Sequence, residues 1–291
     1  MRSGALAAAA LLTACLVAAC GSQHHASRTG ASVVLPTAPP KVVHPVVHHR
    51  THPAAASKPA APFHARAELI THGPRRGHDV ALTFDADMTQ VMLSKVRSGL
   101  HSIGYDPEIV RELRASHTQA TIFMTGLWPT AHPAAANSLA ADPLFEIENH
   151  SYDHAGWEPP CYGLPLVRSE TDKRREVADT TNVLTGLIGG APHYFRFPGG
   201  CHTAADVRLV ASLGETPVQW DVVSGDPGQP NPAVVSRNVL QGARPGSIIV
   251  MHLVGAPNAP ATAAALRTIL PGLHQRGLHP VKLDELLGTG P

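Results

Sequence analysis

The stretch VALTFDAD, residues 80–87, is an apolar run that ends in two carboxylates. Further along, the shorter run FEI at residues 145–147 leads into HSYDH at residues 150–154. Short apolar runs bounded by polar residues are typical of strands buried in a sheet. If both strands lie parallel in one sheet or barrel, the carboxylates and histidines emerge together at one rim.

The spacing of His150 and His154 is typical of a metal centre. Two imidazoles four residues apart, with a carboxylate from elsewhere, make a three-ligand site with one position open for water, as in catalytic zinc. A second carboxylate beside it can act as a base. A single Asp or His at a strand end more often caps a helix or satisfies a backbone donor, but four together favour a functional site.

A zincin protease also places two histidines four residues apart. Its motif is H-E-x-x-H, in which the Glu directly after the first His is the general base. Here Ser151 follows His150, and Glu148 lies on its other side. The sequence therefore argues against this class of protease.

Five short motifs resemble the polysaccharide deacetylases of carbohydrate esterase family four, the NodB-homology group. The resemblance extends roughly over residues 79–287. One such motif alone is weak, but five in the family's order are specific. They are TFDAD at residues 83–87, HSYDH at 150–154, RFPGG at 196–200, WDVVSGD at 220–226 and IIVMH at 248–252.

The resemblance implies one divalent metal ion, with zinc as the expected ion and cobalt or another metal as alternatives. It implies that Asp85 is the catalytic base and that Arg196 holds this aspartate in place through a charge-assisted pair. The expected metal ligands are Asp87, His150 and His154.

The same resemblance also implies which groups stabilise the oxyanion and protonate the leaving amine during hydrolysis of an acetyl group. The backbone N–H of Gly199 is expected to help bind the oxyanion, and His252 to protonate the departing amine. Phe197 and Trp220 are expected beside the oxyanion and the substrate. A lone histidine at a strand end is more often structural, and only its neighbours favour a catalytic role for His252.

The chain departs from the family pattern at three places. Most members have two adjacent aspartates, whereas Ala86 separates them here, so a bulge or the following turn must absorb the change. The aspartate that usually orients the acid histidine is replaced by Val223, and either Asp221 or Asp226 could substitute for it. Pro227 replaces a tryptophan that usually walls the groove, so substrate preference can differ.

The N-terminal quarter has the features of an export segment. Residues 1–19 combine an early arginine with an apolar run too short to span a membrane comfortably, as in a signal peptide. The sequence LVAAC resembles a lipobox, which predicts a lipid on Cys20 and an anchor at the outer face of the plasma membrane. An ordinary cleaved signal and a secreted protein is the alternative. Residues 20–76, rich in Pro, Ala and His, are expected to form a linker.

Residues 77–288 are expected to form one α/β domain, an irregular (β/α) barrel of the NodB-homology type with about seven strands. A net charge of +1 does not indicate the positive charge expected of a protein that binds nucleic acid. No protein partner is predicted. Ser169 and Asp172 predict a helix start, and residues 266–273 carry leucines and an isoleucine at helical spacing. The expected strands are residues 80–84, 120–125, 145–147, 193–197, 217–222, 247–251 and 280–283.

Two cysteines remain outside the export segment. Cys161 follows the histidine pair and Cys201 follows Gly199, so the two can lie close in space. Outside the cytoplasm such a pair is typical of a disulfide, and two free thiols bordering the site are the alternative.

These features predict a metal-dependent deacetylase that acts on an N-acetylated glycan of the cell envelope, such as peptidoglycan or a chitin-like oligomer. An O-acetyl esterase acting on xylan or another wall glycan is the nearest alternative, because the same site cleaves esters. A glycan-binding lipoprotein with decayed catalysis is a further alternative, motivated by Ala86 and Val223. Retention of Asp85, Arg196 and His252 argues against decay.

Overall fold

The structure is a computed structural model that describes residues 63–289. The predicted signal peptide, Cys20 and most of the predicted linker lie outside these residues. Within residues 63–289, no helix combines the length and the apolar character needed to cross a bilayer.

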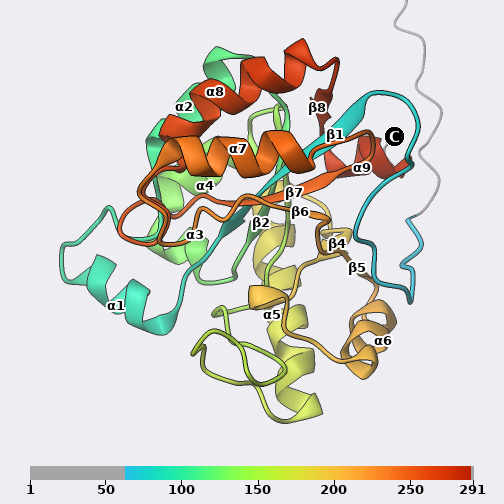
Figure 1. Ribbon diagram of the computed structural model, residues 1–291. Helices are drawn as coiled ribbons and strands as arrows, with labels where there is room; N and C mark the ends of the chain where they lie inside the picture. Colours follow the sequence, from blue (N-terminus) through green and yellow to red (C-terminus); the bar gives the residue numbers. More distant parts are fainter. Residues whose placement is uncertain (1–62, 290–291) are drawn as a thin grey trace, which may run out of the picture. The chain divides into compact units, whose positions relative to one another are not determined.

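A parallel sheet with β1 (Asp79–Ala86) near its middle organises the fold (Figure 1). The order of the paired strands is β5-β4-β3-β2-β1-β7-β6, and β8 pairs with the start of β1. This confirms the predicted α/β barrel, except that the strand expected at residues 217–222 is divided into two. The other strands are β2 (Ala120–Met124), β3 (Phe145–Asn149), β4 (Tyr194–Phe195), β5 (Thr216–Pro217), β6 (Val222–Val223), β7 (Ile248–His252) and β8 (His279–Val281).

Helices cover the outer face of this sheet, as parallel strands require because both of their faces must be buried. Figure 1 shows α7 and α8 beside the β6–β7 side and α5 beside the other half of the sheet. The helices are α1 (Gln90–Arg97), α2 (Pro107–Ala115), α3 (Trp128–Ala131), α4 (Pro133–Ala140), α5 (Glu170–Ile188), α6 (Ala204–Ser212), α7 (Pro232–Gly242), α8 (Thr262–Gln275) and α9 (Leu283–Leu287), with a short 3₁₀ turn at Pro198–Gly200.

Both predicted helix signals are confirmed. The Ser169 hydroxyl accepts a hydrogen bond from the Asp172 backbone N–H and caps α5. In α8, Leu266, Ile269 and Leu273 are buried on one face. The cap fixes where α5 starts, and the apolar stripe decides which side of α8 is buried.

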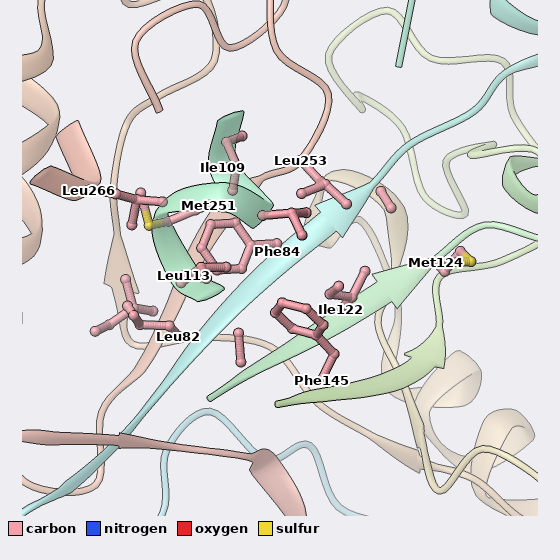
Figure 2. Close-up of a cluster of buried hydrophobic side chains, with 14 of the residues drawn as sticks. Leu82, Phe84, Ile109, Leu113, Ile122, Met124, Phe145, Met251, Leu253 and Leu266 are labelled. Atoms are coloured by element: carbon pink, nitrogen blue, oxygen red, sulfur yellow. The ribbon is translucent and has the colours of Figure 1, made fainter. Parts of the chain in front are cut away.

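Strand alternation decides which side chains enter the barrel. Leu82 and Phe84 point outward and pack against α2, β2 and α8 in the cluster drawn in Figure 2. Thr83 and Asp85 therefore point inward. On the inner face, apolar residues of several strands meet in one second cluster, as expected for a curled sheet; they include Ala81, Phe123, Tyr194, Val218 and Ile248.

The extra residue between the two aspartates is accommodated by this alternation. Ala86 is fully buried on the outer side, and its pairing with Met124 continues the register of β1 with no bulge. Asp85 and Asp87, two residues apart, consequently emerge on the same inner side. The bulge considered from the sequence is not needed.

The folded part begins before residue 77, where the domain was expected to start. The Phe63 ring stacks on the His193 ring, with their centroids 4.2 Å apart. Ile70 is buried and forms a parallel β-bridge with Val218. Residues 63–76 thus pack along the bottom and one edge of the barrel.

Candidate active site

The carboxyl ends of β1, β3 and β7 lie at one rim of the sheet. In the strand register, Asp85 on β1 lies opposite His252, the last residue of β7. Because β3 ends at Asn149, His150 follows directly at the same edge. The structure thus gathers at one rim the carboxylates and histidines that lie far apart in the sequence.

Asp87, His150 and His154 form a cluster that can hold a cation. One ligand atom from each lies within 4.8 Å of the others. Asp87 Oδ1 lies 3.3 Å from His150 Nε2 and 3.4 Å from His154 Nε2. Asp87 Oδ1 and His150 Nε2 are buried without a hydrogen-bond partner among the described residues. Since buried polar atoms are almost always paired, this donor set fits a divalent cation as the common partner.

The charge states around this cluster suit metal binding. Burial raises the pKa of the Asp87 carboxyl, but the neighbouring imidazoles of His154, His150 and His252 outweigh burial and hold that pKa well below its usual range. Burial also lowers the pKa of His154, despite the nearby Asp87. An ionised carboxylate and a neutral imidazole are the forms that ligate metals.

The orientation of the His150 ring is fixed by a hydrogen bond from its Nδ1 atom to the backbone. Its Nδ1 lies 2.9 Å from the backbone carbonyl oxygen of Arg196, which can only accept, so Nδ1 carries the proton. The lone pair of Nε2 then faces Asp87. This is the arrangement by which a backbone partner sets the tautomer of a metal-binding histidine.

The turn between the two histidines is held by a residue that the sequence motifs did not reveal. Glu176, on α5, accepts hydrogen bonds from the Ser151 hydroxyl and from the backbone N–H of Tyr152 at 2.8 Å. His154 itself adopts a left-handed φ of 62°, which is unfavourable for a residue with a side chain. Glu176 lies more than twenty positions away and follows no recognised spacing, so only the packing of α5 against β3 identifies it.

Asp85 pairs with a buried arginine on the inner side of the barrel. Arg196 Nη1 donates to Asp85 Oδ1 at 2.7 Å and also lies 2.8 Å from the Thr83 hydroxyl. The guanidinium lies over the Phe123 ring, 3.9 Å from its centroid. Asp85 Oδ2 is left facing the cluster, 3.6 Å from Nε2 of His150.

His252 is held by Asp226, which decides between the two aspartates considered from the sequence. His252 Nδ1 lies 2.8 Å from Asp226 Oδ1, and the His252 backbone N–H donates to the other carboxylate oxygen. Asp221 instead forms an ion pair with Arg75. Burial opposes the charged imidazole, but the hydrogen bond and charge of Asp226 raise the pKa of His252 to about 10.

A cavity of about 680 Å³ opens over these groups. Gly199 lines it with a left-handed φ of 61°, and Trp220 forms part of its wall. Phe197 differs from the expectation that it lies beside the substrate, because it is fully buried and its ring stacks on His202. The lining residues are Asp85, Asp87, His154, Tyr162, Leu164, Gly199, Trp220, Val223, Ser224, Asp226, Pro227, Gly228, Val250, His252, Val254, Pro257 and Asn258.

A disulfide joins two of the loops at the cavity. Cys161 and Cys201 are bonded, with their Cα atoms 5.8 Å apart. The bond ties the loop that follows His154 to the turn that carries Gly199. A Cβ placed on Gly199 would lie only 3.1 Å from Cys161 Sγ, so this position suits glycine sterically as well as conformationally.

Comparison with known proteins agrees with this geometry. Residues 72–218 match the family described as polysaccharide deacetylase. Among similar proteins, a peptidoglycan-N-acetylglucosamine deacetylase of Bacillus cereus is 26% identical over 217 residues, covering 75% of this chain and 71% of the relative. A chitooligosaccharide deacetylase of Azorhizobium caulinodans is 28% identical over 182 residues, covering 59% of this chain and 82% of the relative.

A solved structure supports the same relationship. A crystal structure of a peptidoglycan N-acetylglucosamine deacetylase superposes with a TM-score of 0.63 and 25% identity, covering 76% of this chain and 94% of that chain. The family match spans half of the chain and includes the first three motifs, with Asp85, His150 and Arg196. The chain therefore belongs to the polysaccharide deacetylase family.

Proposed function

We propose that this protein removes acetyl groups from an N-acetylated glycan of the cell envelope in a metal-dependent hydrolysis. One observation carries the proposal: two members of the three-ligand cluster, a spare carboxylate and a carboxylate-bound histidine line one cavity. Such a hydrolysis needs a polarised carbonyl, an activated water, a stabilised oxyanion and a proton for the leaving amine. A residue of the right kind is present for each requirement.

Asp87, His150 and His154 are the proposed ligands of the divalent ion. When bound, the ion polarises the acetyl carbonyl and lowers the pKa of water. Two imidazoles and one carboxylate form the nitrogen and oxygen donor set of catalytic zinc sites, so we propose zinc as the native ion. Cobalt is the second ion to test.

Asp85 is the proposed base. Its Oδ1 is engaged by Arg196, so the carboxylate cannot rotate freely, and Oδ2 remains available to accept a proton from the attacking water. The backbone N–H of Gly199 is the proposed donor to the oxyanion, because this glycine borders the cavity. Trp220 forms a wall of the same cavity and is a proposed substrate contact.

His252 is the proposed acid that protonates the departing nitrogen. An amine is a poor leaving group unless it receives a proton as the bond breaks. Because Asp226 holds Nδ1, the other ring nitrogen, Nε2, is the one available to donate into the cavity. The carboxylate of Asp226 raises the pKa of His252 and so favours the protonated imidazole that a proton donor requires.

The glycan is inferred from the relatives. The two curated relatives described above are named for peptidoglycan N-acetylglucosamine and for chitooligosaccharides. Both names denote N-acetylated sugar chains, so we propose a substrate of this class. The same groups can also cleave an acetyl ester, so acetylxylan belongs in the test.

We further propose that residues 1–19 are an export signal, that Cys20 carries lipid and that residues after it tether the domain to the outer face of the plasma membrane. Wild-type protein made in bacteria is expected to partition into membranes and detergent, whereas Cys20→Ser is expected to lose that partitioning. Intact-mass analysis checks this. A mature protein without lipid mass contradicts the anchor.

Acetate release by the purified full chain tests the activity. The panel contains chitooligosaccharides, peptidoglycan and acetylxylan, each with and without a chelator and with zinc or cobalt restored. Chelator-sensitive release from an N-acetylated glycan is the expected result. Release from acetylxylan alone would indicate an esterase. Saturable binding with no release from any substrate would indicate a glycan-binding protein.

A further inference from the structure

An exposed aromatic side chain stands at the mouth of the active-site cavity. Tyr162 is 89% exposed, the highest value among the exposed large hydrophobic side chains of the described residues. Of the other three, Val223 lines the same cavity, whereas Val91 and Leu100 lie at either end of the α1 region. Exposure of large apolar groups costs free energy, and their concentration at a cavity is typical of a binding surface.

The loop that carries Tyr162 is built to hold this position. Cys161 is tied to Cys201 by the disulfide, and Leu164 N–H donates to the Cys161 carbonyl at 2.8 Å. Gly156 N–H donates to the Pro165 carbonyl, also at 2.8 Å, which closes the base of the loop. Tyr162 itself has a left-handed φ of 47°, a conformation that a non-glycine residue keeps only when its surroundings enforce it.

Tyr162 and Trp220 lie beside two successive glycines of the proposed oxyanion turn. A Cβ on Gly199 would lie 3.1 Å from Tyr162 Cδ2, and a Cβ on Gly200 would lie 3.1 Å from Trp220 Cη2. Both aromatic rings also line the cavity that contains Asp85. The two glycines therefore let both rings approach the turn closely.

We infer that Tyr162 forms the outer wall of a subsite for a further sugar ring of the glycan, beside the ring that carries the acetyl group. The apolar faces of sugar rings pack on aromatic side chains, and the tyrosine hydroxyl can form hydrogen bonds with hydroxyl groups of the sugar. Apolar neighbours, Leu164 and Val223 among them, extend the wall. The inference rests on the proposed function and narrows its substrate to chains of linked sugars.

The test compares N,N′-diacetylchitobiose and hexa-N-acetylchitohexaose, written below as chitobiose and chitohexaose, with an aryl acetate on the full-length protein. Tyr162→Ala is expected to raise KM for chitohexaose about 3- to 10-fold, the size of one aromatic contact. The rise in KM for chitobiose or the aryl acetate is expected to be smaller. The kcat for chitohexaose is expected to stay near the wild-type value. Tyr162→Phe keeps the ring and is expected to restore most of the affinity. Leu100→Ala removes an exposed side chain that does not line the cavity and serves as the matched control.

The outcomes separate this inference from the proposed function. An equal rise in the KM of Tyr162→Ala for all three substrates, or no rise for chitohexaose, would overturn the proposed subsite. Neither result would contradict the proposed deacetylase activity. If wild type releases no acetate from any glycan, the proposed function fails, and calorimetric binding of chitohexaose then tests the subsite alone. Equal affinity of wild type and Tyr162→Ala in that measurement would overturn it.

Discussion

Two histidines of the site, His150 and His252, are both held through Nδ1, but by different partners. The partner of His150 is the neutral carbonyl of Arg196, at 2.9 Å. The partner of His252 is the carboxylate of Asp226, at 2.8 Å. A neutral acceptor fixes the ring and leaves Nε2 with a lone pair, whereas a carboxylate also stabilises the second proton on the ring.

The difference shows how one side chain serves two roles in the same cavity. His150 presents an unpartnered, buried Nε2 to Asp87. His252, whose pKa rises to about 10 beside Asp226, presents a proton. The proposed metal ligand and the proposed proton donor therefore differ in the group that accepts the hydrogen bond from Nδ1. It is a backbone carbonyl for His150 and a carboxylate for His252.

The largest expected effect sharpens this contrast by altering the carboxylate between the two histidines. Asp85→Asn removes the proposed base but no proposed ligand, and the amide oxygen can still accept from Arg196. Turnover is expected to fall about 10³-fold, within the range of general-base catalysis. Bound metal, measured by elemental analysis, is expected to stay at the wild-type level.

Loss of metal in Asp85→Asn, together with retention of metal in Asp87→Ala, would exchange the roles given to the two aspartates. A fold control is required, because breaking a buried ion pair can cost about 3–5 kcal/mol. Circular dichroism and the melting temperature of each variant provide that control.

The second prediction concerns a substitution that gives His252 a neutral hydrogen-bond acceptor at Nδ1, as His150 has. Asp226→Asn replaces the carboxylate by a neutral amide, so the pKa of His252 is expected to fall. Hydrolysis of an N-acetylated sugar is expected to drop about 10²-fold, and that of an aryl acetate much less, since a phenolate leaves without a proton. Steady-state kinetics on both substrates measure the ratio.

The pH profile of Asp226→Asn gives an independent check. A general acid must be protonated, so amide hydrolysis declines as the pH rises through the pKa of His252. A cation held by Asp87, His150 and His154 would lower that pKa, because a nearby like charge disfavours the protonated imidazole. The basic limb is expected to move to lower pH in the variant; an unmoved limb would assign it to another group.

The smallest expected effect concerns stability and uses chelator-treated protein. The folded pKa of His252 lies above its ordinary value of 6.5, so the stabilisation is complete below pH 6.5 and is lost as the pH rises toward 10. The stability difference between wild type and His252→Ala is expected to shrink steadily over this window, because the variant lacks the group whose stabilisation is lost. Urea unfolding at several pH values measures it, with Leu100→Ala as a variant whose difference should not depend on pH.

The sequence predicted the fold where hydrophobic pattern and local signals agreed. The run at residues 80–87 became β1, and Ser169 caps α5 as expected. The region 217–222 was harder to predict, because the chain leaves one edge of the sheet at Pro217 and joins the other at Val222. Such a crossing depends on how the sheet curls, which local pattern does not encode.

The site shows the same division. The alternation of β1, continued one residue past its end at Ala86, explains why Asp85 and Asp87 share a side despite the intervening alanine. The supports of the site were not predictable, because Glu176 and Tyr162 reach it through the packing of α5 and through a disulfide-tied loop. Choosing Asp226 over Asp221 likewise required the distance to His252.

Metal content and turnover in His150→Ala and His252→Ala, measured side by side, test the central claim most directly. The account predicts that His150→Ala loses bound metal together with hydrolysis of both amide and aryl ester. It predicts that His252→Ala keeps its metal and loses amide hydrolysis at least ~10²-fold more than ester hydrolysis. Full metal and unchanged turnover in His150→Ala, or equal losses on both substrates in His252→Ala, would contradict it.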